Sequence, residues 1–290
     1  MISKYLLDTM DKFLNGERPE IMPYGVKTIY NVKYYDAQMY DADIFYREDR
    51  TQKGVILNIH GGGFLSGEKK GLREFCGLLA EMGYFIFSIN YPLAPEFPHP
   101  SPIESAFKAL DFMVRNSKEY SLDMSKVYIT GESAGAYAAL YTALIILNNE
   151  LADKYQLSSP IPKDALKGLM LYCGIFDFEE AWKSHPRFIF RDMIREYTGL
   201  KKKAFITDND KQYYSPINFV NEKLPRTLIA YAKYDPLKKQ GIMLSEKLIK
   251  NSVNTSVFYA RRFLSMHDFQ LGLKSKDALE CVEITRKFLK

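Results

Sequence analysis

The chain has few cysteines, one tryptophan and no pair of cysteines in a C-x-x-C arrangement. Its three cysteines, Cys76, Cys173 and Cys281, are far apart among 290 residues. This spacing excludes a disulfide-rich scaffold and argues against zinc-ribbon or redox chemistry. It favours buried thiols in a reducing compartment, and we therefore expect a cytoplasmic protein.

Long apolar stretches are also missing. The longest apolar run, Ala138 to Leu147, has the length of a buried helix, whereas a membrane span needs about 20 apolar residues. Asp8 and Asp11 interrupt any apolar core of a signal peptide. The sequence predicts a soluble protein without a membrane span.

No large excess of charge is present. There are 40 Lys and Arg against 35 Asp and Glu, a net charge of +5, and the basic residues are scattered apart from Lys201-Lys202-Lys203. Such a short run is typical of a solvated face, so we expect no nucleic-acid partner. A hydrophobic content of 47% supports a buried core and excludes global disorder.

Short apolar runs without alternation predict strands buried on both faces, as in a parallel sheet. These runs are Val55–Ile59, Tyr84–Ile89, Val127–Thr130, Leu166–Tyr172, Thr227–Tyr231 and Val257–Tyr259. Helical patterns lie near Leu72–Met82, Ala134–Asn148, Gly241–Asn251 and Lys276–Phe288. A further helix should begin at the capping box Ser101-Pro102-Ile103-Glu104 and run to about Asn116. The alternation predicts an α/β fold, with a mostly parallel central sheet and helices on both faces.

Three further segments have their own patterns. Residues 2–14 have helical periodicity, and Val26–Tyr35 and Ala42–Arg47 look like a hairpin or adjacent edge strands. About 50 residues separate Cys173 from Thr227 and carry many aromatic residues, too many for an ordinary crossover. We interpret residues 176–212 as an inserted helical cap on a single domain of residues 1–290. The alternative is that these aromatics only thicken the main core.

A G-x-S-x-G motif follows one predicted strand. Gly131-Glu132-Ser133-Ala134-Gly135 lies between the strand Val127–Thr130 and an alanine-rich helix, the setting of a nucleophile elbow. Its glycines let strand and helix approach closely around a sharp turn. Ser133 is therefore the candidate nucleophile.

A run of three glycines follows another predicted strand, Val55–Ile59. In His60-Gly61-Gly62-Gly63-Phe64, successive backbone N–H groups are uncovered and can point at an anion. The alternative is a turn that only needs glycine for a positive φ. Beside a nucleophile elbow, the run favours an oxyanion hole. No G-x-G-x-x-G or P-loop is present, so the glycines do not indicate a nucleotide.

A serine nucleophile needs a base and a group that orients the base. Of the four histidines, His267 alone comes late enough for the order Ser, Asp, His of such sheets. For the acid we favour Asp235, which leaves the strand Thr227–Tyr231, over its rival Asp177. Asp268 is adjacent to His267, and neighbouring side chains usually diverge.

With these motifs the chain resembles the α/β-hydrolase superfamily, and within it the hormone-sensitive-lipase-like carboxylesterases. The matching residues are His60-Gly61-Gly62-Gly63, Tyr91-Pro92-Leu93-Ala94-Pro95-Glu96, Gly131-Glu132-Ser133-Ala134-Gly135, Ser215-Pro216, Asp235-Pro236-Leu237 and His267.

The resemblance implies a serine hydrolase of small soluble esters that needs no cofactor and no metal. It places the oxyanion donors on Gly62, Gly63 and Ala134, and it implies that residues 1–24 and the inserted helices cap the acyl pocket. Enzymes of this kind often pair, so a homodimer is a further expectation. The chain departs from the family pattern at Glu132, Ala136, Pro92 and Asp268, where Asp, Gly, Arg and Gly are usual.

The leading hypothesis is thus an esterase acting on short acyl chains through an acyl-enzyme on Ser133, with His267 as base and Asp235 orienting it. An arylformamidase or another amide-cleaving hydrolase would use the same groups. A ligand-binding protein that lost catalysis is the alternative of another class, and the presence of all three side chains argues against it.

Overall fold

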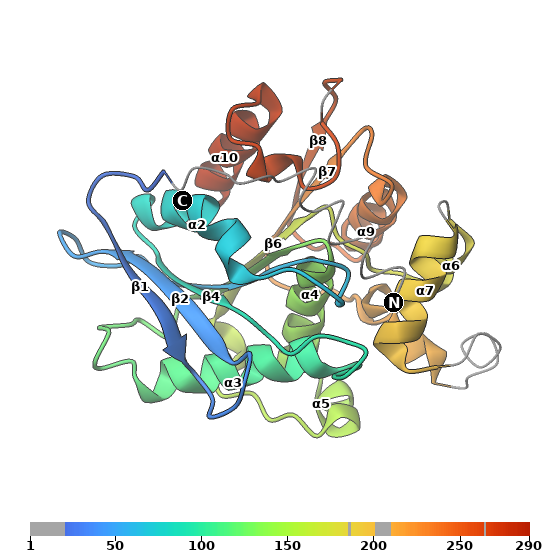
Figure 1. Ribbon diagram of the computed structural model, residues 1–290, viewed down its shortest axis with the longest axis horizontal. Coiled ribbons are helices and arrows are strands. Elements are labelled where there is room, and N and C mark those ends of the chain that lie inside the picture. The colour runs from blue at the N-terminus through green and yellow to red at the C-terminus, as the bar shows by residue number, and fades with distance from the viewer. Residues whose placement is uncertain (1–20, 185–186, 201–209, 264) are drawn as a thin grey trace.

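An eight-stranded sheet forms the centre of the computed structural model, which describes residues 21–184, 187–200, 210–263 and 265–290. Its strands are β1 (Val26–Lys33), β2 (Asp41–Arg47), β3 (Val55–Ile59), β4 (Phe85–Ile89), β5 (Val127–Glu132), β6 (Leu166–Tyr172), β7 (Thr227–Ala232) and β8 (Thr255–Ala260). They lie in the order β1-β2-β4-β3-β5-β6-β7-β8 (Figure 1). Strand β2 runs antiparallel to both of its neighbours, and the other pairs are parallel. The predicted mostly parallel sheet is confirmed.

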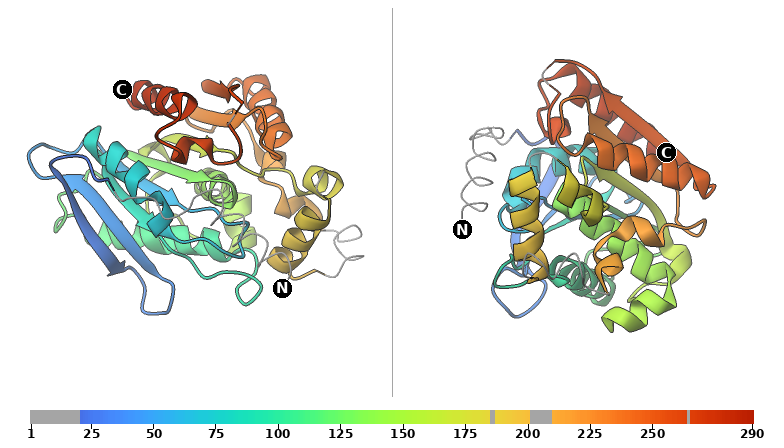
Figure 2. Two further views of the ribbon diagram at one scale, coloured as in Figure 1. Left: turned by 45° about the horizontal axis from the view of Figure 1, so that its top comes forward. Right: turned by 90° about the vertical axis from the view of Figure 1, so that its right-hand side faces the viewer.

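Helices cover both faces of the sheet. Helices α2 (Arg73–Glu81) and α10 (Lys276–Phe288) pack on one face, and α3 (Ser101–Arg115), α4 (Ala134–Leu147) and α9 (Lys238–Lys250) pack on the other (Figures 1 and 2). Alternate strand residues feed the two cores: Leu57 belongs to the cluster with α3 and α4, and Ile56 to the cluster with α2 and α10. This two-sided burial explains why the strands read as unbroken apolar runs.

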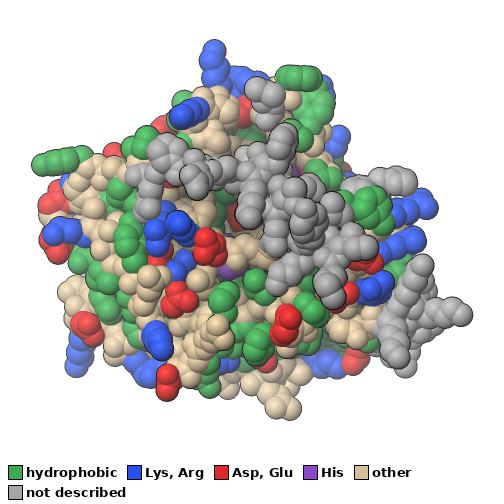
Figure 3. Space-filling view, in the orientation of Figure 1, with side chains coloured by type: hydrophobic (Ala, Val, Ile, Leu, Met, Phe, Trp, Pro, Cys, Tyr) green, Lys and Arg blue, Asp and Glu red, His purple; other side chains and the backbone are tan. Residues whose placement is uncertain are grey.

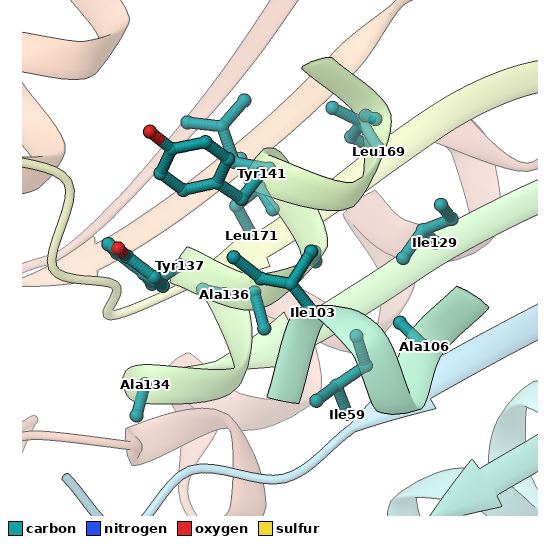
Figure 4. Packing of buried hydrophobic residues seen from close by; sticks show 14 of the residues in the cluster. Ile59, Ile103, Ala106, Ile129, Ala134, Ala136, Tyr137, Tyr141, Leu169 and Leu171 are labelled. Carbon is teal, nitrogen blue, oxygen red and sulfur yellow. The ribbon is translucent and has the colours of Figure 1, made fainter. Parts of the chain in front are cut away.

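Helix α4 is buried on every side, which accounts for the longest apolar run of the sequence. Nearly all of its residues are shielded from solvent between the sheet, α3 and the segments after β6. A helix that is apolar all round is stable only inside a core. Figure 4 shows its Ala134, Ala136, Tyr137 and Tyr141 close to Ile103 and Ala106 of α3 and to Ile59, Ile129, Leu169 and Leu171 of the strands.

Some element boundaries differ from the prediction. The prediction of a capping box at Ser101 is wrong. Helix α3 begins at Ser101, after Pro100, and no side chain caps it. The Ser101 hydroxyl donates instead to the carbonyl of Pro92 at 2.9 Å. Helix α9 starts at Lys238, three residues earlier than expected. Helix α5 (Asn149–Tyr155), which was not predicted, starts where the Asn148 side chain accepts from two backbone N–H groups. The predicted helix over residues 2–14 lies outside the described residues.

The segment between β6 and β7 contains helices. They are α6 (Phe178–Lys183), α7 (Arg187–Thr198) and the short 3₁₀ turns η3 (Lys211–Tyr214) and η4 (Pro216–Phe219). Two of its aromatic residues, Phe178 and Tyr197, are fully buried and pack against Phe64 and Tyr137 of the main core. The inserted residues therefore form helices and also extend the core; their function as a cap stays a prediction.

Within the described part of the chain, no helix is long and apolar enough to cross a membrane. On the face shown in Figure 3, basic and acidic side chains are interspersed.

Candidate active site

Four loops that carry the predicted residues leave the same edge of the sheet. The loop at residue 60 follows β3, Ser133 follows β5, Asp235 follows β7 and His267 follows β8. Because β3, β5, β7 and β8 are parallel, their carboxyl ends lie at one edge. The topology alone thus gathers residues that are far apart in the sequence.

Ser133 lies at a strained turn between β5 and α4. Its backbone has φ +53° and ψ −117°, and its N–H donates to the carbonyl of Tyr172 at 2.9 Å. The turn requires glycine at Gly135, where an added Cβ would lie only 2.0 Å from the carbonyl oxygen of Ile59. This geometry, a sharp turn with close approach of β3 and α4, matches the expected nucleophile elbow.

Ser133, His267 and Asp235 form one chain of hydrogen bonds. His267 Nε2 lies 2.9 Å from Ser133 Oγ, and His267 Nδ1 lies 2.9 Å from Asp235 Oδ1. The same Asp235 oxygen accepts from the N–H of Leu237 at 2.7 Å, which fixes the carboxylate. With Nδ1–H donated to Asp235, Nε2 is the acceptor for the serine hydroxyl, as general-base activation requires.

The rivals of these residues have other partners. Asp177 caps α6 by accepting from the N–H of Glu180 at 3.0 Å. His99 contacts the hydroxyls of Tyr155 and Tyr197 at 3.0 and 3.2 Å, and burial lowers its pKa to about 3. His60 stacks on Tyr91, and burial lowers its pKa to about 4. The fourth histidine, His185, lies outside the described residues.

The glycine run lies at the same edge of the sheet as Ser133 and carries backbone donors. Gly62 and Gly63 have φ +100° and +59°. The alternative interpretation, a turn that needs glycine for a positive φ, is therefore also met. Among the described residues, neither of their N–H groups donates a hydrogen bond. Ala134 is the first residue of α4, where an N–H has no acceptor within the helix. The three expected oxyanion donors are therefore available, two in the loop after β3 and one at the start of α4.

Two carboxyl groups missed as site residues lie beside the triad. Glu132 Oε1 accepts from the N–H of Gly61, which ties the end of β5 to the glycine run. Asp268 Oδ2 lies 3.3 Å from His267 Nε2. The expectation that the side chains of residues 267 and 268 diverge is wrong, because Asp268 has left-handed backbone with φ +54°. Both residues were already visible in the sequence as departures from the family pattern.

The carboxylates around His267 control its basicity. Burial by itself would lower the pKa of His267, but the charges of Asp268 and Asp235 outweigh it and raise the pKa above its ordinary value of 6.5. The imidazolium form is therefore stabilised, as serine hydrolysis requires once the serine proton has moved.

A metal ligand set is not favoured here. Within the described residues, the group with suitable spacing is Cys173, Asp235 and His267, whose ligand atoms lie within 4.8 Å of one another. Burial raises the pKa of the Cys173 thiol well above its ordinary value, and a protonated thiol is a poor ligand. Asp235 and His267 are already bonded to each other.

Solved structures share this architecture. Esterase B from Lactobacillus Rhamnosis matches with a TM-score of 0.81 and 18% identity, over 99% of this chain and 96% of its own. An esterase from Pyrobaculum calidifontis gives a TM-score of 0.71 and 22% identity, over 100% of this chain and 90% of its own. At these identities the likeness shows the fold.

The chain is also similar in sequence to curated proteins and to one protein family. An acetyl esterase of Salmonella choleraesuis is 29% identical over 213 residues, which make up 70% of this chain and 62% of that protein. An acetyl esterase of Salmonella paratyphi A is 28% identical over the same shares. The match thus spans less than two thirds of these relatives' length. Residues 56–271 match the family described as alpha/beta hydrolase fold, and because this match covers most of the chain, the protein belongs to the α/β-hydrolase family.

Proposed function

We propose that this chain is a serine hydrolase of carboxylic esters. The observation that carries the proposal is the unbroken chain from Ser133 Oγ through His267 to Asp235, with both hydrogen bonds at 2.9 Å. Within the described residues, the N–H groups of Gly62 and Gly63 donate to no acceptor, which supports the same function. The relatives reported above are all named esterases.

The proposed reaction proceeds in two halves. His267 Nε2 takes the Ser133 proton as Ser133 Oγ attacks the ester carbonyl, and the oxyanion receives hydrogen bonds from the N–H groups of Gly62, Gly63 and Ala134. His267 then gives its proton to the leaving alcohol, which leaves an acyl group on Ser133. Water, deprotonated by His267, releases the acid by the same route. Asp235 accepts the Nδ1–H of His267 throughout and so keeps Nε2 free to accept.

Short acyl chains are the proposed substrates. The residue after the glycine run, Phe64, stacks on Tyr197 at 3.8 Å and lies against Tyr137 and Phe178, and all four rings are buried. Such a filled aromatic cluster, with the helices of the inserted segment as a cap, leaves room for small groups. The acetyl esterase names of the relatives agree with this size.

A panel of p-nitrophenyl esters from two to twelve acyl carbons tests the proposal. We expect the highest kcat/KM for acetyl to butyryl esters and a steep fall beyond them. Ser133→Ala should abolish turnover without loss of folding, and a fluorophosphonate probe should label the native chain but not this variant. Esterase activity retained by Ser133→Ala would refute the assignment.

The same assay tests the other expectations. If N-formylkynurenine is cleaved faster than p-nitrophenyl acetate, the enzyme is an amide hydrolase of arylformamidase type. If neither is cleaved and the probe fails to label Ser133, the chain is a binding protein. We further propose a cytoplasmic location, supported by three free and buried cysteines, and a homodimer, which light scattering in solution would test.

A further inference from the structure

Two carboxyl groups outside the proposed triad meet next to its base. Asp268 Oδ2 lies 3.3 Å from His267 Nε2, the same nitrogen that lies 2.9 Å from Ser133 Oγ. Asp235 occupies the other ring nitrogen. The imidazole therefore has a carboxylate on each side, whereas general-base activation of a serine needs one, on the Nδ1 side.

Glu132 is the second of these carboxyl groups. Its Oε1 accepts from the N–H of Gly61, and its Oε2 is buried and receives no hydrogen bond from the described residues. Burial, and then the charge of Asp268 and a hydrogen bond with that side chain, raise the pKa of Glu132 well above its ordinary value. Two carboxyl groups that interact this closely do not both ionise, and we assign the shared proton to Glu132, which is buried, rather than to Asp268, which is half-buried.

Two further titratable side chains of the described residues face this pair, and both are neutral. Cys173, which follows β6, and Tyr91, which follows β4, both have pKa values raised well above the ordinary range by burial. Asp235 lies at the other ring nitrogen, Nδ1, at 2.9 Å. Within the described residues, the charge that remains near Nε2 is that of Asp268.

We propose that Asp268 is a positioning residue that binds the protonated form of His267 from the Nε2 side, with protonated Glu132 as its hydrogen-bond donor. The inference rests on the proposed function, because it concerns the base of that reaction. Its consequence is a pH threshold: ester hydrolysis starts at a pH above the ordinary titration of histidine.

The threshold follows from the two tasks of His267. Only the neutral ring can accept the serine proton, so a carboxylate that stabilises the imidazolium delays the onset of activity to higher pH. Once the ring is neutral, the same carboxylate stabilises the imidazolium that forms during attack on the ester. Asp268 should therefore lower the rate of ester hydrolysis at acidic pH and raise the rate on the alkaline plateau of the pH profile.

Three matched variants test this. Asp268→Asn removes the charge and keeps the shape. Glu132→Gln keeps the Oε1 acceptor for Gly61 and replaces the carboxyl O–H toward Asp268 by an amide N–H. Asp111→Asn makes the same change at an exposed pair on α3 with Arg115, at the end of the helix far from the catalytic edge.

The pH profile of kcat/KM for p-nitrophenyl acetate is the first readout. For Asp268→Asn we expect the acid limb to move down by about one pH unit or more, which is about tenfold in activity relative to the plateau at a given acidic pH. The plateau value of kcat should fall. Glu132→Gln and Asp111→Asn should leave the acid limb in place. A variant that was merely damaged would not gain relative activity at acidic pH.

Two outcomes would overturn the inference: an acid limb unchanged in Asp268→Asn, or a limb that Glu132→Gln lowers as far as Asp268→Asn does, since Glu132 would then carry charge. An NMR titration of protein labelled with ¹⁵N-histidine, with His267 assigned by comparison with His267→Gln, gives the ring pKa without any substrate. If the native chain hydrolyses no ester, the proposed function fails, while this titration still decides whether Asp268 raises the pKa of His267.

Discussion

Gly135→Ala should damage both stability and activity, although alanine is the better helix former. Gly135 is the second residue of α4, and alanine at an unhindered helix position stabilises by about 1 kcal/mol over glycine. Here the added Cβ would lie 2.0 Å from the carbonyl oxygen of Ile59 and 2.6 Å from that of His60. Ordinary contact begins at 3.4 Å, so β3 and α4 must separate by more than an ångström.

The neighbours cannot rotate away, because both are backbone atoms. Overpacking of this kind costs about 1–3 kcal/mol, which exceeds the gain in helix propensity. The separation also moves the glycine run away from Ser133. A misplacement of about 1 Å in a reacting geometry can lower activity about 100-fold, and we expect a loss of that order in kcat/KM.

Gly71→Ala is the matched control. Gly71 lies in the 3₁₀ turn η1 (Lys69–Leu72) and has no positive φ. Apart from its chain neighbours, no atom of the described residues lies within 4 Å of the position that an added Cβ would occupy. The same substitution there should be neutral or stabilise by about 0.4–1 kcal/mol through the unfolded state. Urea unfolding and kcat/KM for p-nitrophenyl acetate compare the two. A Gly135→Ala variant as stable and active as the native chain would refute the steric argument.

Three further predictions concern the residues around the site. Asp235→Asn should lower kcat about 10⁴-fold with the fold intact by circular dichroism, because a neutral amide neither holds the tautomer nor stabilises the imidazolium; a loss below tenfold would contradict its role. Asp177→Ala should cost about 1 kcal/mol in unfolding free energy through loss of the α6 cap and leave kcat within about twofold, and loss of turnover would instead favour Asp177 as the triad acid. His99 should make the protein sensitive to acid: its pKa is depressed to about 3 in the folded state, so its contribution is complete above the ordinary value of 6.5 and is lost as the pH falls below it. At pH 5 the loss in the free energy of unfolding is about 2 kcal/mol. Urea unfolding at pH 7.5 and pH 5 measures this loss, and His99→Gln should reduce the difference between the two pH values by that amount. An equal difference in the native chain and the variant would show that His99 does not titrate on unfolding.

For the inserted segment, the sequence predicts burial but does not determine which segments the buried residues contact. Its aromatic residues predict buried contacts, but the same residues serve a cap or a thicker core equally well. In the structure Tyr197 stacks on Phe64 and its hydroxyl contacts His99, so one side chain joins the inserted helices to the loops after β3 and β4. Such contacts depend on where distant segments pack, which periodicity does not encode.

The sequence by itself determined the strands, the parallel sheet and the identity of Ser133, Asp235 and His267 as a candidate set. It could do so because local backbone preferences mark each strand and turn, and because parallel strands bring their carboxyl ends to one edge whatever their separation in sequence. The surroundings of His267 were decided by tertiary structure alone. The left-handed backbone of Asp268 places its carboxylate near Nε2, although the side chain was expected to diverge from His267. Burial raises the pKa of Glu132, because the cost of a charge depends on the atoms that enclose it.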